Sequence, residues 1–334
     1  MSTFPVQYSM LSSKALQAFI IQQYGDPALS CRLLLRNVSD TYIIEKAGAP
    51  MYIFKVYRIS HRSLHEIQGE VALLNRLHEG GAAVSYPIPD LQGNQIQDFN
   101  APEGLRHGVL FSYAKGVNIY DLTEAQLQLV GREMARVHNI TANLVLPHER
   151  EEYDINRLLL QPLAILGPAF KDHAEGYTYL KDTAQKVIQQ LNKLSTDSFS
   201  YGYLQYDFLP KNFHFDEQGQ LTFFDFDFTG KGWMANDAAS FFLHFFFHAG
   251  AGKMTQEAAD RDFQVFIDAY RSVRPFSDDE LKAVPYLGFV FWIFYLGYQY
   301  THFEEWSNWF FTPRYLTDRV QVIKKYVELH CTFN

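Results

Sequence analysis

The spacing of apolar residues divides the chain into a strand-rich first third and a helix-rich remainder. Short apolar and aromatic runs between turn residues predict strands, the first three as an antiparallel meander, at 32–36, 41–45, 51–57 and 107–112. Apolar positions repeated every three or four residues predict helices at 12–24, 62–78, 178–195, 255–272 and 278–331. The polar segment 94–103 is predicted to be a loop. These patterns favour an α+β protein, with a β-sheet part at 1–113 and a larger, mainly helical part at 114–334.

One stretch, residues 205–228, concentrates the candidate chemistry. Asp207 is followed five residues later by Asn212, then by two aromatic runs that flank the polar turn 216–219. Such a turn predicts a hairpin, and a hairpin would bring Asn212 close to Asp225 at the far end of the second run. An amide oxygen and a carboxylate are hard ligands that suit Mg²⁺.

This order of residues has a known counterpart. An Asp-x-x-x-x-Asn loop followed by a strand that ends in Asp-Phe is the layout of a kinase catalytic loop and its metal-binding aspartate. The stretch resembles the aminoglycoside phosphotransferase and choline kinase group of small-molecule kinases, which also carry an Asp-Leu-Ala-like motif where this chain has Asp237-Ala238-Ala239. The chain departs from the family pattern at Gln205, where His is usual, and at Tyr206, where Gly is usual.

The resemblance implies a fold and a set of roles. It implies a protein-kinase-like bilobal fold, with an N-terminal antiparallel sheet lobe and a larger helical lobe. Asp207 is expected to be the catalytic base, and Asn212 and Asp225 to hold Mg²⁺ on the phosphates of ATP. Lys55, in the third predicted strand, is expected to bind the phosphates with a glutamate of the next helix as its partner. Glu70 is favoured for that role, because family members place the glutamate just ahead of an apolar run, and Glu66 is the competing candidate.

Further contacts with the nucleotide follow from the same resemblance. Ser39 lies in a turn that takes the place of a Gly-rich loop, and its side chain is expected to cap phosphates. The segment 110–117 resembles the inter-lobe hinge, where the carbonyl of Ser112 and the amide of Ala114 would contact adenine. Asp237 is expected to brace the catalytic loop, and His138 to be a structural, hydrogen-bonded histidine.

Composition narrows the class of partner. The 334 residues carry a net charge of −8, which argues against a nucleic-acid backbone as the partner. Two cysteines, far apart in sequence, fit a reduced, cytoplasmic setting, and the N-terminus shows no signal peptide. The most apolar stretch, 286–298, is short for a membrane helix and is predicted to be a buried helix.

The predicted reaction is ATP-dependent phosphorylation of a hydroxyl on a small molecule. A pseudokinase that binds nucleotide or metabolite without turnover is the first alternative, because of Gln205 and Tyr206, and a metal-dependent hydrolase that uses the acids is the second. The acceptor is left open. A cationic acceptor is one option, since acids and aromatic rings alternate in the C-terminal segment at Tyr298, Tyr300, Glu304, Glu305, Trp306 and Trp309. His244 and His248 are spaced like helical metal ligands but are predicted to belong to the core or to a pocket wall.

Overall fold

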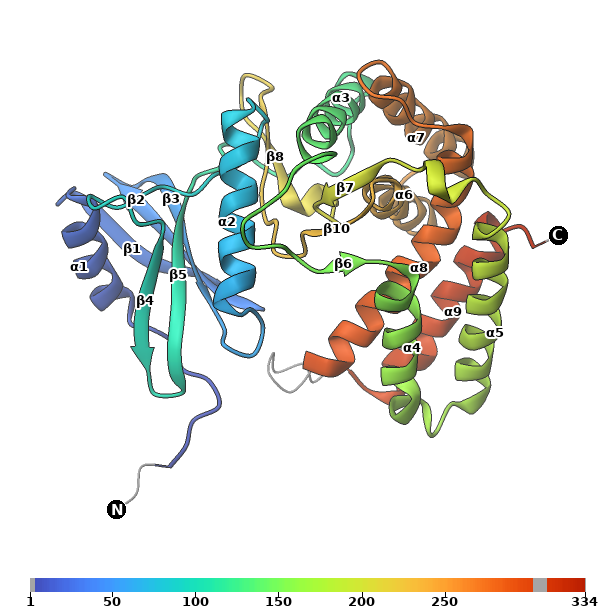
Figure 1. Ribbon diagram of the computed structural model, residues 1–334, viewed down its shortest axis with the longest axis horizontal. Helices are drawn as coiled ribbons and strands as arrows, with labels where there is room; N and C mark the ends of the chain where they lie inside the picture. The colour runs from blue at the N-terminus through green and yellow to red at the C-terminus, as the bar shows by residue number, and fades with distance from the viewer. Residues whose placement is uncertain (1–3, 303–310, 334) are drawn as a thin grey trace. The chain divides into compact units, whose positions relative to one another are not determined.

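The computed structural model describes residues 4–302 and 311–333 and divides into two compact units. The first unit comprises Met1–Gly116, Val145–Arg150 and Asp216–Phe224. The second comprises Val117–Leu144, Glu151–Phe215 and Asp225–Asn334. The predicted division after residue 113 lies close to the end of the first long segment, although two short later segments also belong to the first unit. The predicted α+β composition, with an N-terminal antiparallel sheet and a larger helical part, is confirmed (Figure 1).

The first unit is built on a five-stranded antiparallel sheet in the order β1-β2-β3-β5-β4. Its strands are β1 (Leu29–Arg36), β2 (Ser39–Lys46), β3 (Ala49–Tyr57), β4 (Ile96–Ala101) and β5 (Gly104–Ser112), and its helices are α1 (Ser13–Tyr24) and α2 (Leu64–Glu79). The short strand β9 (Leu221–Phe223) also lies here, and Val84 forms a parallel bridge with Phe223. The predicted three-stranded meander is therefore present, and β5 extends the sheet beyond β3.

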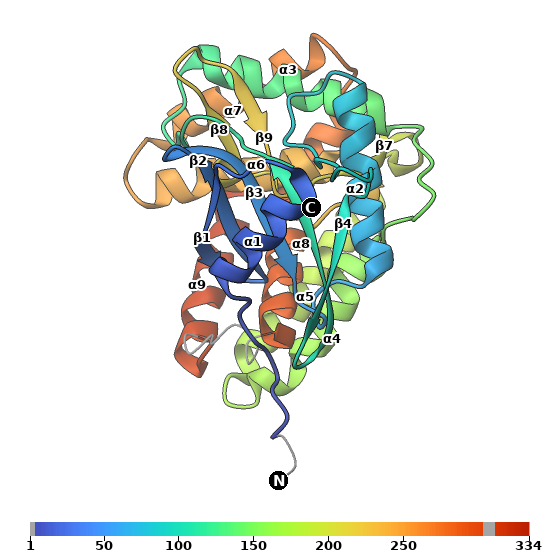
Figure 2. The ribbon, with the colours of Figure 1, turned by 90° about the vertical axis from the view of Figure 1, so that its left-hand side faces the viewer.

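Alternation of side chains creates the core of this sheet. Tyr42 and Ile44 on β2 and Phe54 on β3 point to the same face and are fully buried there. Leu16 and Ile20 of α1 pack onto that face, and Figure 2 shows α1 lying across the sheet. Burial of these apolar side chains is the main source of stability in this layer.

The prediction of a loop at 94–103 was wrong, because β4 occupies residues 96–101 and pairs with β5. β4 is the edge strand, so two of its three polar residues, Asp98 and Asn100, are exposed and the segment lacks an apolar pattern. Its one buried polar residue, Gln97, donates a hydrogen bond to Asp90 at 2.9 Å. The pattern of hydrophobic residues alone therefore predicts a loop for a polar edge strand of this kind.

The second unit is mainly helical. Its helices are α3 (Glu124–Thr141), α4 (Gln161–Leu166), α5 (Ala174–Leu191), α6 (Ala235–Gly250), α7 (Gln256–Arg271), α8 (Asp278–His302) and α9 (Pro313–His330). Short strands β6 (Glu152–Tyr153), β10 (Gly230–Trp233) and β7 (Tyr201–Leu204) form a three-stranded sheet in that order, and β8 (Phe213–Phe215) follows the loop that carries Asp207. Where one helical region was predicted at 278–331, the described residues form two helices, α8 and α9.

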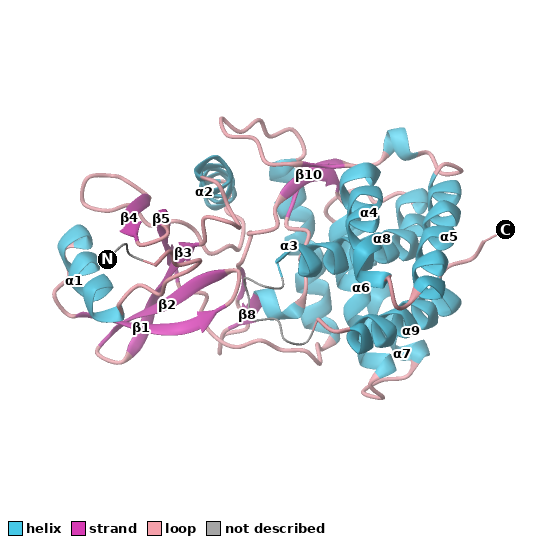
Figure 3. Ribbon diagram, turned by 90° about the horizontal axis from the view of Figure 1, so that it is seen from below, coloured by secondary structure: helices cyan, strands magenta, loops and turns pink. Residues whose placement is uncertain are grey.

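Helix α8 is the central core helix of the second unit. It is long and apolar enough to cross a membrane by length and composition, but 67% of its most apolar window is buried inside the protein. Figures 1 and 3 show α6, α8 and α9 side by side, and their aromatic residues fill the space between them. The predicted buried helix at 286–298 is thus confirmed, as part of α8.

Candidate active site

The carboxylate of Asp237 fixes the start of the loop that carries Asp207. Asp237 lies in the first turn of α6 and is 1% exposed. Its Oδ1 accepts a hydrogen bond from the Tyr206 amide at 2.6 Å, and its Oδ2 accepts one from the Gln205 amide at 3.0 Å. Nε2 of His138, on α3, lies 3.0 Å from the same Oδ2. Asp237 therefore makes the contacts expected of a brace for this loop, and His138 is a buried, hydrogen-bonded histidine, as predicted.

Two residues of the site, Tyr206 and Asp225, have left-handed backbone conformations, with φ values of 67° and 60°. Each such non-glycine residue costs roughly 1–2 kcal/mol, so the surrounding contacts must hold it in place. The Tyr206 ring is fully buried, with ring centroids 4.9 Å from both Tyr153 and Phe294. A glycine at this position would adopt the left-handed backbone without strain, whereas Tyr206 combines backbone strain with burial of a large ring.

Gln205 connects the two strained positions. Its side-chain Nε2 donates a hydrogen bond to the carbonyl oxygen of Asp225 at 3.3 Å. Since Gln205 stands where the family has His, a hydrogen-bond donor is retained at this position. The departure from the family pattern therefore leaves a hydrogen bond between the loop that carries Asp207 and the segment that carries Asp225.

Asp207 is a buried carboxylate with one free oxygen. It is 3% exposed, and its Oδ2 accepts hydrogen bonds from Lys211 Nζ at 2.7 Å and from Asn212 Nδ2 at 2.9 Å. Its Oδ1 is buried and has no hydrogen-bond partner among the described residues. Burial raises the pKa of Asp207, the positive charge of Lys211 opposes the rise, and the negative charge of Asp225 adds to it. A carboxylate of raised pKa is a better proton acceptor than an exposed one.

Asn212 and Asp225 supply oxygen atoms of the kind that Mg²⁺ prefers. The Asn212 amide nitrogen donates to the backbone carbonyl of Asp207 at 2.8 Å as well as to its carboxylate, so the other end of the amide presents its oxygen. Asp225 is exposed, and its charge acts on both Asp207 and Lys211. The donor set, one amide oxygen and one carboxylate, fits Mg²⁺, which takes few protein ligands together with phosphates and water.

Lys55 and Glu70 lie together in the first unit. Lys55 Nζ is 3.9 Å from Glu70 Oε1, and both side chains are at least nine-tenths buried. The hydroxyl of Tyr57, on β3, donates a hydrogen bond to Glu70 Oε2 at 3.1 Å, which links the Glu70 carboxylate to that strand. Burial on both sides limits the freedom of the lysine, so its ammonium group is well positioned.

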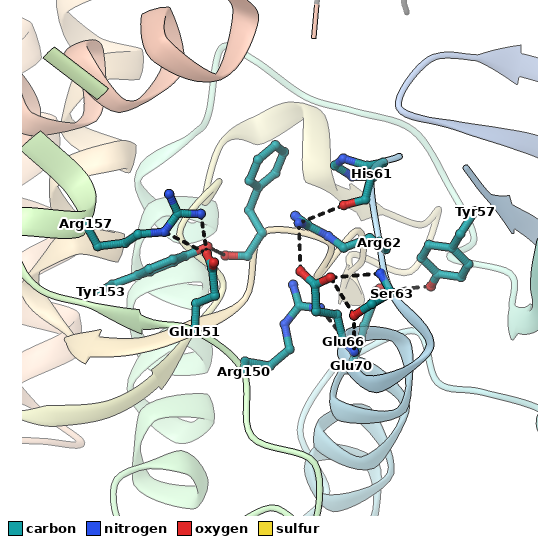
Figure 4. A network of polar contacts seen from close by, with 11 residues as sticks. Tyr57, His61, Arg62, Ser63, Glu66, Glu70, Arg150, Glu151, Tyr153 and Arg157 are labelled. Atoms are coloured by element: carbon teal, nitrogen blue, oxygen red, sulfur yellow. Dashed lines mark hydrogen bonds and ion pairs between the residues drawn. The ribbon is translucent and has the colours of Figure 1, made fainter. Parts of the chain in front are cut away.

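Glu66, the competing partner for Lys55, has a different task. Its carboxylate closes a capping box with Ser63 at the start of α2 and lies 3.2 Å from Arg62. Burial would raise the pKa of Glu66, but the charge of Arg62 and the hydrogen bonds from Ser63 outweigh it, and the pKa is lowered. Figure 4 shows this network, in which Arg150 also donates to the Glu66 backbone carbonyl at 2.8 Å.

The remaining predicted nucleotide contacts all lie in the first unit. Ser39 is buried and begins β2, so the predicted turn is shorter than expected. The carbonyl of Ser112, the last residue of β5, accepts a hydrogen bond from the Ser85 hydroxyl at 2.6 Å, which leaves one lone pair for another donor. Ala114 follows two residues later in an irregular segment and is buried. Their roles in binding a nucleotide stay predictions.

A cavity of about 240 Å³ opens beside Asp207 within the second unit. It is lined by the loop that carries Asp207 together with α6, α8 and α9. Sequence reasoning missed the polar residues of its wall, namely Lys211, Tyr295, Gln299 and Arg319. Lys211 carried a signal, since it stands four residues after Asp207 in the loop, but the others come from helices with no motif.

His244 and His248 line up on α6 without forming a metal site. Their ring centroids are 4.1 Å apart, but His244 Nε2 lies 2.9 Å from the carbonyl of Tyr120 and His248 Nδ1 lies 3.3 Å from Asp121. Within residues 4–302 and 311–333, no group of three or more His, Cys, Asp or Glu side chains could hold a metal ion. The burial of both rings and their contacts with Tyr120 and Asp121 agree with the predicted place of the pair in the core or a pocket wall.

The buried His244 is expected to make stability depend on pH. Burial, and then the nearby His248, lowers the pKa of His244 to about 4, below the roughly 6.5 of an unfolded chain. The unfolded state therefore binds a proton first as pH falls, and stability present above pH ~6.5 is lost down to about pH 4, by about 3 kcal/mol. Urea unfolding of wild type and His244→Gln between pH 7 and 4 measures this, and the variant should lose less stability. Parallel curves would contradict the prediction.

Comparison with known proteins identifies the family. A model of the phosphotransferase enzyme family matches residues 30–276. The chain belongs to this family. An uncharacterized protein of Synechocystis sp. is 29% identical over 91% of this chain and 83% of its own length. Amicoumacin kinase of Bacillus subtilis is 27% identical over 64% of this chain and 63% of its own length.

Solved structures confirm the kinase-like fold. A structure of the amicoumacin kinase hAmiN, in complex with AMP-PNP, Ca²⁺ and Ami, superposes with a TM-score of 0.73. The alignment covers 96% of this phosphotransferase-family chain and 97% of the other, at 17% sequence identity. At that identity the likeness shows the fold, and the residues of the site must be argued from their own geometry.

Proposed function

We propose that this phosphotransferase-family protein transfers the γ-phosphoryl group of ATP to a hydroxyl group of a small molecule. The observation that carries the proposal is the buried Asp207, which lines a cavity and has one carboxylate oxygen held by Lys211 and Asn212, while its Oδ1 has no hydrogen-bond partner of regular geometry among the described residues. A general base must be desolvated, correctly oriented and open to the hydroxyl that it serves. The burial of Asp207, the two hydrogen bonds that hold its Oδ2 and its place in the cavity wall support this role.

The other residues take the following parts in the proposal. Asn212 and Asp225 would hold Mg²⁺, which neutralises phosphate charge when bound. Lys55, paired with Glu70, would bind the phosphates of ATP, while Ser39, Ser112 and Ala114 would complete the nucleotide site. Asp207 would orient the acceptor hydroxyl and accept its proton. Positioning and charge neutralisation, rather than covalent catalysis by the protein, would supply the rate enhancement.

The contact made by Gln205 favours an active kinase over a pseudokinase. Its hydrogen bond to the Asp225 carbonyl keeps a brace where the family has His, and Asp237 holds both Gln205 and Tyr206. A cytoplasmic location is part of the proposal and is supported by the two cysteines, Cys31 and Cys331, which are both free.

The suggestion of a cationic acceptor stays a prediction. Glu304, Glu305, Trp306 and Trp309 lie outside the described residues. The Tyr298 ring packs against Phe228, with ring centroids 4.8 Å apart, and the Tyr300 ring packs against Phe311 at 5.6 Å. These contacts are those of core and surface packing, so the described part of the segment does not favour a cation.

Thermal unfolding with Mg·ATP tests the nucleotide site. We expect millimolar Mg·ATP to raise the melting temperature of wild type, since a ligand at 100 times its Kd stabilises the folded state by about 2.7 kcal/mol. The rise should disappear when EDTA removes Mg²⁺ and should be largely lost in Asp225→Ala, which lacks a metal ligand. Absence of any shift in wild type would overturn the proposed use of ATP.

A further inference from the structure

The cavity beside Asp207 is small and chemically uneven. Its volume of about 240 Å³ is below the roughly 300–1,000 Å³ of sites for drug-sized ligands, so it suits a compact acceptor. Phe247, Phe291 and Leu296 are among the apolar residues of its wall. Its polar groups come from the catalytic loop and from α8 and α9, and they differ in charge and in hydrogen-bonding capacity.

One pair of polar groups fits an alcohol. Asp207 and Tyr295 both line the cavity, and neither the buried Oδ1 of Asp207 nor the buried hydroxyl of Tyr295 makes a hydrogen bond to a third group among the described residues. Burial raises the pKa of Tyr295 well above its usual value, and so do the negative charge of Asp207 and the close approach of the Tyr295 hydroxyl to the Asp207 carboxylate, so the hydroxyl stays protonated and can donate. One alcohol hydroxyl satisfies both groups, because it donates to Asp207 and accepts from Tyr295.

The remaining polar groups of the wall are donors. The guanidinium carbon of Arg319 lies 5.1 Å from the ring centroid of Trp292 and 5.0 Å from that of Tyr315. Trp292 is 6% exposed, and its indole N–H, which can only donate, has no partner in the described part of the chain. The Gln299 carbonyl oxygen accepts from the Tyr315 hydroxyl at 2.8 Å, which leaves the two amide N–H groups of Gln299 as donors.

The balance of charge in the wall is positive. Asp207 is the one carboxylate among the described lining residues, and it is already paired with Lys211 at 2.7 Å. No carboxylate in residues 4–302 and 311–333 lies within ion-pair distance of Arg319. The rings of Trp292 and Tyr315 already contact the guanidinium group, so they are not available to bind a second cation. A second cation would therefore meet repulsion, whereas a planar carboxylate matches the guanidinium fork.

We propose that the acceptor is a small hydroxy acid, with its hydroxyl between Asp207 and Tyr295 and its carboxylate bound by Arg319 with help from Trp292 and Gln299. The inference rests on the proposed phosphotransferase function. The acceptor oxygen forms a bond to the γ-phosphorus of ATP as the bond from that phosphorus to the β,γ-bridging oxygen breaks. The hydroxyl proton passes to Asp207, and the products are a phosphate monoester of the acid, ADP and one proton.

Binding of matched probes without nucleotide tests the substrate class independently of ATP. The probes are ω-hydroxy acids of three, four and five carbons, the corresponding hydroxy amides, and the corresponding amino alcohols, with binding followed by ligand-observed NMR. We expect the best acid to bind wild type roughly 10- to 100-fold more tightly than its amide or amino alcohol. Equal binding of the three classes, or no acid bound at 10 mM (about the weakest affinity such a site would have), would overturn the proposal.

Variants of Arg319 and a control on the same helix complete the test. Arg319→Gln should remove the preference for the acid, and Arg319→Glu should reverse it in favour of the amino alcohol. Arg314→Gln is the matched control, because Arg314 is 91% exposed on α9 and is not part of the cavity wall. An acid preference that survives Arg319→Gln would overturn the proposal. Loss of the Mg·ATP thermal shift with acid binding intact would instead remove the proposed function alone.

The Tyr295 hydroxyl has its own readout in the same assay. With ATP and Mg²⁺ present, ADP release measures turnover of the best acid, and Tyr295→Phe removes only the donor that would hold the acceptor oxygen. We expect kcat/KM to fall roughly tenfold for the acid, while binding of the matching carboxylate without a hydroxyl group stays unchanged. Equal losses for both ligands would show that Tyr295 acts on the cavity as a whole and would overturn its assigned contact.

Discussion

Asp207→Asn is expected to lower kcat for phosphoryl transfer by about a thousandfold, because an amide cannot accept the proton of the acceptor hydroxyl. The substitution preserves size, and the new amide oxygen can still accept the hydrogen bonds that Lys211 and Asn212 now donate to Oδ2. Thermal stabilisation by Mg·ATP should therefore match that of wild type. Single-turnover ADP release, with the best hydroxy acid as the acceptor, measures the effect.

The pH dependence of kcat separates loss of a base from a general disturbance. Burial raises the pKa of Asp207, so wild-type kcat should fall as the pH drops through that raised value, where the carboxylate becomes protonated. This acid limb should be absent in Asp207→Asn. Asp182→Asn, an exposed substitution on α5, is the control and should behave as wild type. A kcat within tenfold of wild type for Asp207→Asn would show that another group acts as the base.

The strand pattern of the first unit was predictable where side chains alternate across a buried face. Tyr42, Ile44 and Phe54 carry this signal, and the predicted meander is present. The prediction from this pattern failed at β4, whose residues make main-chain hydrogen bonds at the edge of the sheet and bury little apolar surface. An edge strand is stabilised by hydrogen bonds to the neighbouring strand, so its own sequence need not show the alternating apolar pattern that predicts a strand.

The catalytic loop was predictable because its chemistry is local in sequence. Asp207, Asn212 and Asp225 lie within 19 residues, and a hairpin turn between them was readable from Asp216 to Gly219. The structure shows Asp207 bonded to Asn212 and places Asp225 near enough to affect its pKa. The catalytic and metal-binding roles themselves stay predictions until they are measured.

The cavity wall could not be predicted, since its polar residues are brought together only by helix packing. Tyr295 and Gln299 lie in α8, where a nearly continuous aromatic sequence indicates burial but not which side chain borders a cavity. Arg319 lies on α9, in a helix whose charged residues read as an ordinary exposed face. The suggestion of a cation rested on other aromatic residues of this segment, whereas the rings that border the cavity, Trp292 and Tyr315, already contact the guanidinium group of Arg319.

Asp237→Asn is expected to destabilise the second unit by about 3 kcal/mol. Both carboxylate oxygens accept hydrogen bonds, from the amides of Gln205 and Tyr206 and from the His138 ring, and an asparagine offers one acceptor in their place. Its NH₂ group would face a buried N–H group, so at least one donor would lose its partner. The left-handed backbone at Tyr206 would also lose a contact that holds it. Urea unfolding followed by far-UV circular dichroism measures the change.

A matched substitution on the neighbouring helix α7 separates this effect from simple loss of charge. Asp260 is exposed and accepts a hydrogen bond from Gln256 at 2.8 Å, which an asparagine oxygen can also accept, so Asp260→Asn should change stability by about 0.5 kcal/mol or less. Equal stabilities for the two variants would show that Asp237 does not brace the loop. The two aspartates of the site should thus differ in kind. Asp207→Asn should lower the rate with stability intact, whereas Asp237→Asn should lower both, because the catalytic base is positioned by the loop that Asp237 holds.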